Sequence, residues 1–268
     1  MLPNFSCLAS IRRLHPLIHC ISNLVTANDC ANLAYALGAS PIMAHAPQEA
    51  ETITAAAAVT ILNTGTPARD KFRACLLAGA EAARLGHPIV LDPVGAGASA
   101  WRLDAVNQLL ERFTPTILRV NLAEAQALCG GFGREHGVDS PAAPQTQRLD
   151  AALHLARRFG GKTAVLLSGP EDLITDGETV WSVSGGSELM TRITGTGCML
   201  SVLCGVFSAA EEAPLDAALL ASIFWKICAE KAAEASRAPG SFRVALMDAA
   251  GTLTPADCAQ ASRLRRIL

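Results

Sequence analysis

Short runs of apolar residues recur along the sequence, and each is followed by a polar or glycine-bearing turn and then by a longer segment with helical spacing. The runs have the length of buried strands, and the segments between them have the length of helices. Strands that alternate with helices indicate a mainly parallel sheet with helices on its faces. The predicted strands are residues 17–21, 40–44, 59–62, 88–93, 116–120 and 163–168.

The helical segments are predicted from the same pattern and from proline and glycine at their ends. One helix ends near Leu37, and the others cover residues 47–58, 68–85, 103–113, 121–129, 150–159, 198–210 and 214–236, with a final helix after residues 239–241. Pro47 is expected to open its helix at the first turn. Because no linker or internal repeat interrupts the pattern, we expect one domain over residues 1–268.

Two segments depart from the strand and helix alternation. Asp176-Gly177 lies between the apolar runs 173–175 and 179–183, which predicts an antiparallel hairpin with a type I′ turn added to the sheet. Residues 130–146 show no periodicity and are rich in Gly, Pro, Gln and His, so we expect a surface connection there.

Polar or sulfur-containing residues stand where the predicted parallel strands end. They are Asn23, Met43, Asn63, Asp92 and Asn121. Ligands of such sheets bind beyond the carboxyl ends of the strands. These residues are therefore candidates for a site at one edge of the sheet.

The stretch Thr194-Gly195-Thr196-Gly197-Cys198 precedes the apolar run 199–210, which reads as a buried helix. A glycine turn at a helix start presents free N–H groups at the positive end of the helix dipole, which suits a phosphate group. The same position favours a thiolate on Cys198 over a thiol. The alternative is an ordinary glycine-rich loop before a core helix, with Cys198 as a small buried hydrophobe.

Composition narrows the class of protein. The chain has 268 residues and a formal net charge of −2, and its Lys and Arg residues are scattered, so no nucleic-acid footprint is present. Half of the residues are hydrophobic and only 17% are charged, which suggests apolar surface hidden in an oligomer.

Cysteine usage and the N-terminus bear on the compartment. The nine cysteines are widely spaced without a C-x-x-C pair, so neither a zinc cluster nor a disulfide framework is indicated. A reducing cytoplasm fits best. Arg12 and Arg13 follow the first apolar residues, the reverse of a secretory signal, and no apolar run is long enough to span a bilayer.

Five segments in a fixed order resemble the hydroxyethylthiazole kinase family over about residues 16–249. They are residues 16–23, 38–44, 91–97, 119–124 and 194–198. The resemblance implies a ribokinase-like three-layer α/β/α fold and a homotrimer with active sites between subunits. It also implies ATP-dependent phosphorylation of the primary alcohol of 4-methyl-5-(2-hydroxyethyl)thiazole in thiamine salvage.

Phosphoryl transfer needs positioning and charge neutralisation, and several residues suit these tasks. Asp92 and Glu124 offer oxygen ligands for Mg²⁺, although each read singly is more often a turn or helix-capping acid. The family pattern implies ATP contacts for Arg119 and for Ser168, where threonine is usual. Taken alone, Arg119 would equally be a surface salt-bridge partner.

The acceptor side of the site is implied by the same resemblance. Asn23, Met43 and Gly195 match thiazole-side positions, Asn23 as a polar amide and Met43 as a polarizable thioether. Met43 alone would more often be a core residue. Among departures from the family pattern, Val120 replaces a glycine between the family's arginine and asparagine, and Thr196 replaces a common alanine.

Cys198 stands where other ribokinase-like kinases carry an aspartate base. We expect the helix N-terminus to lower its thiol pKa from about 8.5, so that Cys198 orients the alcohol and accepts its proton late. The Gly195 to Gly197 N–H groups are expected to stabilise the moving phosphoryl group. The rival functions are another ribokinase-like kinase, such as a hydroxymethylpyrimidine kinase, and a catalytically silent ligand-binding oligomer.

Overall fold

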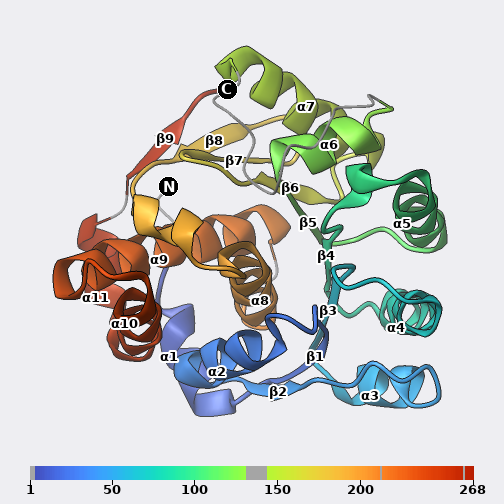
Figure 1. Cartoon of the computed structure of the whole chain (residues 1–268), viewed down its shortest axis with the longest axis horizontal. Helices are drawn as coiled ribbons and strands as arrows, with labels where there is room; N and C mark the ends of the chain where they lie inside the picture. The colour runs from blue at the N-terminus through green and yellow to red at the C-terminus, as the bar shows by residue number, and fades with distance from the viewer. Residues whose placement is uncertain (1–3, 131–143, 212, 262) are drawn as a thin grey trace.

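One mixed sheet of nine strands, in the order β2-β1-β3-β4-β5-β6-β7-β8-β9, organises the computed structural model, which describes residues 4–130, 144–211, 213–261 and 263–268 (Figure 1). The strands β1 to β6 are parallel, and β7, β8 and β9 are added antiparallel. The strands are β1 (Leu17–Ile21), β2 (Ser40–Ile42), β3 (Val59–Asn63), β4 (Ile89–Asp92), β5 (Ile117–Val120), β6 (Ala164–Leu167), β7 (Asp172–Thr175), β8 (Val180–Val183) and β9 (Leu264–Arg266).

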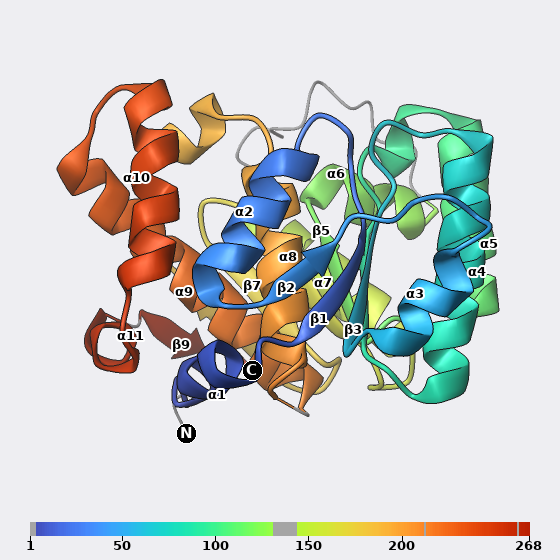
Figure 2. The same cartoon turned by 90° about the horizontal axis from the view of Figure 1, so that it is seen from below.

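Helices cover both faces of this sheet and make a three-layer α/β/α arrangement (Figures 1 and 2). One face carries α1 (Cys7–Leu14), α2 (Ala27–Leu37), α8 (Thr196–Ser208), α9 (Pro214–Ala235), α10 (Pro239–Thr252) and α11 (Pro255–Ala261). The other face carries α3 (Ala50–Ala56), α4 (Arg69–Leu85), α5 (Ala100–Arg112), α6 (Leu122–Leu128) and α7 (Gln145–Arg158). Short 3-10 helices cover Ala96–Ala98 and Glu188–Arg192.

The central strands are apolar on both faces because each face is covered by helices. Alternate residues of β5 and β6 enter opposite cores: Ile117 and Leu166 face α8 and α9, whereas Leu118 and Val165 face the α4 to α7 layer. Successive side chains of a strand point to opposite faces, so two separate cores are the direct result. The expected parallel sheet with an antiparallel extension is confirmed.

The hairpin is present, but its predicted type I′ turn is wrong. Strands β7 and β8 pair Thr175 with Val180, which leaves a four-residue loop, 176–179. Gly177 has a positive φ of 98°, while Asp176 is absent from the residues with positive φ, and a type I′ turn needs both. Asp176 instead uses its carboxylate Oδ1 to accept from the Glu178 and Thr179 N–H groups, at 2.9 and 2.7 Å.

Other boundaries differ from the sequence prediction at chain positions with weak local signals. Residues 47–49 form a turn, so α3 begins at Ala50 rather than at Pro47, and α7 begins at Gln145 inside the predicted connection. The helices α1 and α11 and the strand β9 were not predicted, and α11 follows the helix expected to be final. Most of the predicted connection, residues 131–143, lies outside the described residues.

Within the described ranges, no helix combines the length and the apolar character that a membrane crossing requires.

Candidate active site

The N-terminus of α8 lies at the carboxyl edge of the parallel strands, beside α2 (Figure 2). Gly195 caps the helix in a left-handed conformation, with φ of 90°, and a Cβ there would lie 2.4 Å from Cγ2 of Thr26. Only glycine fits this backbone and this contact. The first bond of the helix joins Met199 N to Gly195 O, so the N–H groups of residues 196–198 have no acceptor within the helix.

Arg119, at the end of β5, lies directly beneath this helix start. A Cβ on Gly197 would lie 2.5 Å from its Nη2 and 2.8 Å from its Cζ, so the guanidinium packs against the backbone of α8. Nη2 donates to Ser168 Oγ at 2.7 Å, and Nη1 contacts Asp92 Oδ1 at 3.4 Å. Arg119 is 7% exposed, and its Nε has no partner among the described residues.

The buried surroundings change the acidity of the Arg119 guanidinium. Burial lowers its pKa, but the nearby carboxylates of Asp92 and Glu124 offset this, and the pKa is raised overall. Arg119 therefore remains a fixed positive charge, with one unused donor, at a helix terminus that also favours anions.

Asp92, the last residue of β4, is fully buried and receives hydrogen bonds from three elements. Its Oδ2 accepts from Asn63 Nδ2 at 2.8 Å and from Ser201 Oγ at 2.7 Å, and its Oδ1 faces Arg119. Donors on β3, β5 and α8 therefore fix the orientation of this carboxylate.

Glu124 belongs to a capping box at the start of α6. Its Oε2 accepts from Asn121 N at 2.8 Å, and Asn121 Oδ1 accepts from Glu124 N at 2.8 Å. Its Oε1 accepts from Gly95 N at 3.0 Å. Burial raises the pKa of Glu124 to about 7, with a further contribution from the charge of Asp92, while Arg119 acts in the opposite direction.

Glu124 therefore does cap α6, which was one of the two roles that the sequence left open. It also lies close enough to Asp92 for the charge of Asp92 to raise its pKa. Within the described residues, no group of three or more His, Cys, Asp or Glu side chains is arranged to hold a metal ion. Mg²⁺ commonly takes only one or two protein carboxylates, with water and substrate phosphates as its other ligands. Asp92 Oδ1 and both carboxylate oxygens of Glu124 each accept one hydrogen bond and keep a second lone pair, so Asp92 and Glu124 fit such a partial ligand set.

Cys198 lies in the first turn of α8 and is 8% exposed. The predicted lowering of its pKa is wrong, because burial and the charge of Asp92 raise the pKa of this thiol. Arg119 and hydrogen bonds with Thr26 and Asn63 lower it by less. Desolvation and the Asp92 charge outweigh these contributions, and the resting side chain is a neutral thiol.

Asn23 and Met43 follow the two neighbouring strands β1 and β2. Asn23 Oδ1 accepts from Val25 N at 2.9 Å, and its amide packs against Gly65, where a Cβ would lie 2.4 Å from Nδ2. Gly65 N in turn donates to Asn63 Oδ1 at 2.9 Å, which links Asn23 to the Asp92 cluster. Met43 is partly buried against the core of α8 and α9 and makes no polar contact among the described residues.

Both departures from the family pattern are accommodated by ordinary structure. Val120 is buried in the core beneath α4 to α7 and pairs in register with Leu167 of β6, so the backbone under Arg119 stays regular. The Thr196 carbonyl accepts from Trp225 Nε1 at 3.1 Å, which ties the start of α8 to α9.

Sequence reasoning missed the roles of Ser201 and Thr26, and it named Asn63 only by its place at the strand end. Ser201 lies one helical turn after Gly197, on the same face of α8. This helical spacing from the glycine turn was the signal that could have indicated Ser201. Thr26 had no such signal, because its contact with Gly195 joins residues far apart in the chain.

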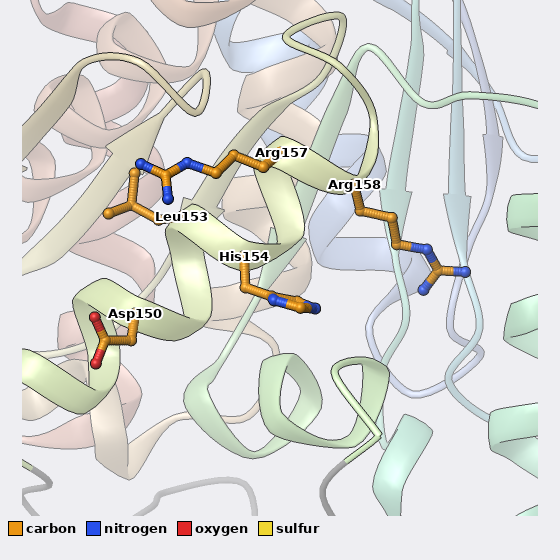
Figure 3. Close-up of a pocket in the computed structure, with 5 residues that line it drawn as sticks. All are labelled: Asp150, Leu153, His154, Arg157 and Arg158. Carbon is orange, nitrogen blue, oxygen red and sulfur yellow. The ribbon is translucent and has the colours of Figure 1, made fainter.

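A separate groove of about 580 Å³ lies on α7 and is lined by Asp150, Leu153, His154, Arg157 and Arg158 (Figure 3). Its two arginines extend away from one another, toward Gly177 O and Leu128 O, at 3.2 and 3.4 Å. None of the predicted site residues lines it. The last turn of α7 precedes the amino end of β6, whereas Ser168 follows its carboxyl end.

Comparison with known proteins gives a consistent result. The sequence profile of the hydroxyethylthiazole kinase family matches residues 8–256. The hydroxyethylthiazole kinase of Nitratidesulfovibrio vulgaris (strain DP4) is 42% identical over 240 residues, which cover 90% of this chain and 89% of the relative. That of Pyrococcus furiosus is 39% identical over 260 residues, covering 97% and 96%.

Solved structures agree with this assignment of the fold. The hydroxyethylthiazole kinase from Pyrococcus horikoshii OT3 superposes with a TM-score of 0.89 at 36% identity and covers 98% of both chains. The pyridoxal kinase from Staphylococcus aureus in complex with ADP has a TM-score of 0.61 at 15% identity, covering 80% of this chain and 87% of that one, and shows the fold alone. The ribokinase-like fold expected from the sequence is confirmed.

Proposed function

The chain belongs to the hydroxyethylthiazole kinase family, and from that premise we propose that it transfers the γ-phosphoryl group of ATP to the hydroxyl of 4-methyl-5-(2-hydroxyethyl)thiazole in thiamine salvage. It is a kinase, and the product is the thiazole monophosphate. The single observation that carries this conclusion is the family match over residues 8–256. The buried Arg119 beneath the glycine turn of α8 supports it independently, because a phosphate group needs such donors.

The nucleotide side of the proposed site consists of Arg119, Ser168 and the start of α8. The unused Nε of Arg119 and the N–H groups of residues 196–198 supply donors for phosphate oxygens. These donors are held by packing and by the Asp92 and Ser168 contacts before any ligand binds. Preorganised donors of this kind stabilise charge that develops on the moving phosphoryl group.

Mg²⁺ is the proposed metal, and Asp92 and Glu124 would hold it, directly or through water. When bound, such an ion neutralises negative charge on the phosphate oxygens. The buried carboxylate pair supports this part of the proposal, since Asp92 and burial together raise the pKa of Glu124 to about 7 and a cation between them would favour the ionised form.

The acceptor alcohol is proposed to lie among Asn23, Met43, Gly195 and Cys198. The amide of Asn23 provides a polar contact, and Met43 provides a polarizable apolar surface for a sulfur heterocycle. Because the raised pKa keeps Cys198 a thiol, we limit its role to orienting the hydroxyl. In a loose transition state the hydroxyl proton leaves late and can pass to an oxygen of the transferred phosphoryl group.

We also propose a homotrimer with active sites between subunits. Leu24 and Val25, which follow Asn23 directly, are 67% and 64% exposed. Large apolar side chains beside a substrate-binding residue are explained if a second copy of the chain covers them. Sedimentation equilibrium tests this assembly, and a monomer at micromolar concentration would contradict it.

The cytoplasm remains our proposal for the compartment. All nine cysteines are free, which suits a reducing environment. The single continuous sheet likewise supports the proposal of one domain over residues 1–268.

A coupled assay of ADP release with ATP, Mg²⁺ and the thiazole alcohol tests the function. Hydroxymethylpyrimidine is the matched alternative acceptor, and a reaction without acceptor measures background hydrolysis. We expect turnover that depends on the thiazole alcohol and is lost when the metal is chelated. Turnover with the pyrimidine alone, or binding of both ligands without turnover, would contradict the proposal.

A further inference from the structure

Two lysines outside the predicted site are buried, although lysine is seldom found in the interior. Lys71, in the first turn of α4, is 7% exposed, and Lys226, in α9, is 8% exposed. These helices cover opposite faces of the sheet (Figure 1). Burial of an ammonium group costs free energy unless the group is paired, and burial lowers the pKa of Lys71.

Lys226 is bonded to the loop that follows β6. Its Nζ donates to Gly169 O at 3.0 Å and to Pro170 O at 3.1 Å, and it lies 3.4 Å from Asp172 Oδ1. Asp172 Oδ1 also accepts from Gly169 N at 2.9 Å. The N–H and the carbonyl of Gly169, the residue directly after Ser168, are therefore both hydrogen-bonded.

Asp172, which holds this loop through Gly169 N, is itself held by α9. Ser222 Oγ, one turn earlier in α9, donates to Asp172 Oδ2 at 2.8 Å. Ser168 Oγ accepts from Arg119 Nη2 at 2.7 Å, so the loop fixed by Lys226 carries one side of the Arg119 contact. Loss of the Lys226 ammonium would release two carbonyls next to the proposed ATP residues.

Lys71 is bonded to the loop that follows β3. Its Nζ donates to Gly65 O, which also accepts from Thr66 Oγ1 at 2.8 Å. Thr66 has a positive φ of 45°, an unusual backbone for a β-branched residue, and its Oγ1 accepts from Leu24 N at 3.0 Å. The loop is thus fixed against the segment that carries Asn23.

The Gly65 peptide also packs on Asn23 itself. A Cβ on Gly65 would lie 2.4 Å from Asn23 Nδ2 and 3.0 Å from Asn63 Oδ1, so backbone and amides are in close contact. Movement of the Gly65 carbonyl would displace the surface on which the Asn23 amide lies.

We propose that Lys226 and Lys71 are positioning residues for different substrates: Lys226 fixes the loop that presents Ser168 and the Arg119 contact to the nucleotide, and Lys71 fixes the loop against which Asn23 meets the alcohol. This inference rests on the proposed function. Each lysine acts through backbone carbonyls, so neither needs to touch a substrate. Because the two loops follow β3 and β6, which are separated by β4 and β5 in the sheet, their effects are separable.

Lys226→Met and Lys71→Met keep an unbranched chain but remove the charge and the donors. Steady-state kinetics with each substrate varied separately should give a KM for ATP raised about tenfold in Lys226→Met and a KM for the thiazole alcohol raised about tenfold in Lys71→Met, the loss typical of a hydrogen bond from a charged group. The other KM should change by less than about twofold in each variant.

Lys231→Met is the control, because Lys231 belongs to the same helix as Lys226 but its side chain is 47% exposed. Both KM values should be unchanged in it. Lys226→Gln and Lys71→Gln retain an N–H donor and should recover part of each loss, and they also serve if a methionine variant fails to fold. Thermal unfolding of every variant separates lost stability from altered binding.

Equilibrium binding of ADP and of the thiazole alcohol to the same variants does not require turnover. A wild-type chain without kinase activity would therefore refute the proposed function, while the binding data would still test the lysines. Equal losses for both ligands in both variants would indicate general loosening and overturn the inference. Unchanged binding and KM values in folded variants would overturn it as well.

Discussion

Gly197→Ala adds one methyl group at the point where α8 packs on Arg119. The new Cβ would lie 2.5 Å from Nη2 and 2.8 Å from both Cζ and Nη1. Carbon and nitrogen atoms in ordinary contact are roughly 3.5 Å apart, so the guanidinium or the helix must move by about 1 Å. The substitution therefore tests whether the close fit of these two groups matters for nucleotide use.

Arg119 cannot move freely, because it is 7% exposed and bonded on two sides. A displacement of that size breaks the 2.7 Å bond to Ser168 Oγ and alters the contact with Asp92. A hydrogen bond that involves a charged group contributes about 1.5–3 kcal/mol, which corresponds to a roughly 10- to 150-fold loss in kcat/KM for ATP. Stability should fall less, since alanine is favoured over glycine in a helix by about 1 kcal/mol.

Gly205→Ala is the matched control in the same helix. Its Cβ would lie 2.4 Å from Cδ1 and 2.6 Å from Cγ1 of Ile61, so it crowds the apolar core and not Arg119. Overpacking costs about 1–3 kcal/mol, partly offset by the same gain in helix propensity. This variant should unfold at a lower temperature while kcat/KM for ATP stays within about twofold of wild type, because the site is not displaced.

The assay is steady-state kinetics with ATP varied at saturating thiazole alcohol, together with thermal unfolding of both variants. A folded Gly197→Ala enzyme with wild-type kcat/KM for ATP would show that the Arg119 position is irrelevant to the nucleotide. Equal kinetic losses in the two variants would attribute the effect to α8 as a whole and refute the local explanation.

Three further predictions concern Cys198, Glu124 and His19. Cys198→Ser should lower kcat, whereas Cys198→Asp should retain or raise it by supplying a carboxylate base; equal, near-zero kcat in both would contradict a role in orienting the alcohol. The apparent affinity for Mg²⁺, titrated between pH 6 and 8, should fall about tenfold per pH unit below the pKa of Glu124, about 7, because protonation removes a ligand charge; a pH-independent affinity would exclude Glu124. His19 is fully buried in β1, and burial lowers the pKa of its imidazole. The unfolded chain therefore binds the proton first, and stability is lost as pH falls below about 6.5. Urea unfolding at several pH values should show a smaller loss in His19→Gln, and equal losses in both proteins would refute this explanation.

The sheet and most helix positions were predictable because they depend on local patterns. Each buried strand is a short apolar run. A helical segment connects most of these runs to the next, and such connections favour parallel pairing. The strand β9 was not predictable in this way. It contains only Leu264, Arg265 and Arg266, and it pairs with β8, which lies more than 80 residues earlier in the chain.

The site residues at strand ends were predictable for a related reason. Parallel strands place their carboxyl ends at one edge, so Asp92, Arg119 and Ser168 meet there although they are far apart in sequence. The partners that complete the site were not predictable. Lys226 reaches the Gly169 carbonyl from α9, 57 residues later in the chain, and nothing near Lys226 in the sequence marks that contact.

The Cys198 pKa shows where local reasoning fails. The prediction depended on the position at a helix N-terminus, which by itself favours the thiolate. The sequence left burial of Cys198 as an alternative and did not reveal that Asp92 lies nearby, and burial and the Asp92 charge both raise the pKa of the thiol. An ionisation state depends on the charges and the solvent around a group, which are properties of the tertiary structure.

The charges of the cluster also favour metal-bound nucleotide at the proposed site. Two buried carboxylates, Asp92 and Glu124, lie close enough to the Arg119 guanidinium to shift its pKa, so the cluster carries an excess negative charge when both are ionised. Free nucleotide would bring further negative charge toward them, at a place where burial limits screening. A divalent cation bound with the phosphates reverses the sign of that interaction. The carboxylates would then attract the complex that the Arg119 and α8 donors are proposed to bind, and the pair of acids that disfavours free nucleotide would favour its metal-bound form.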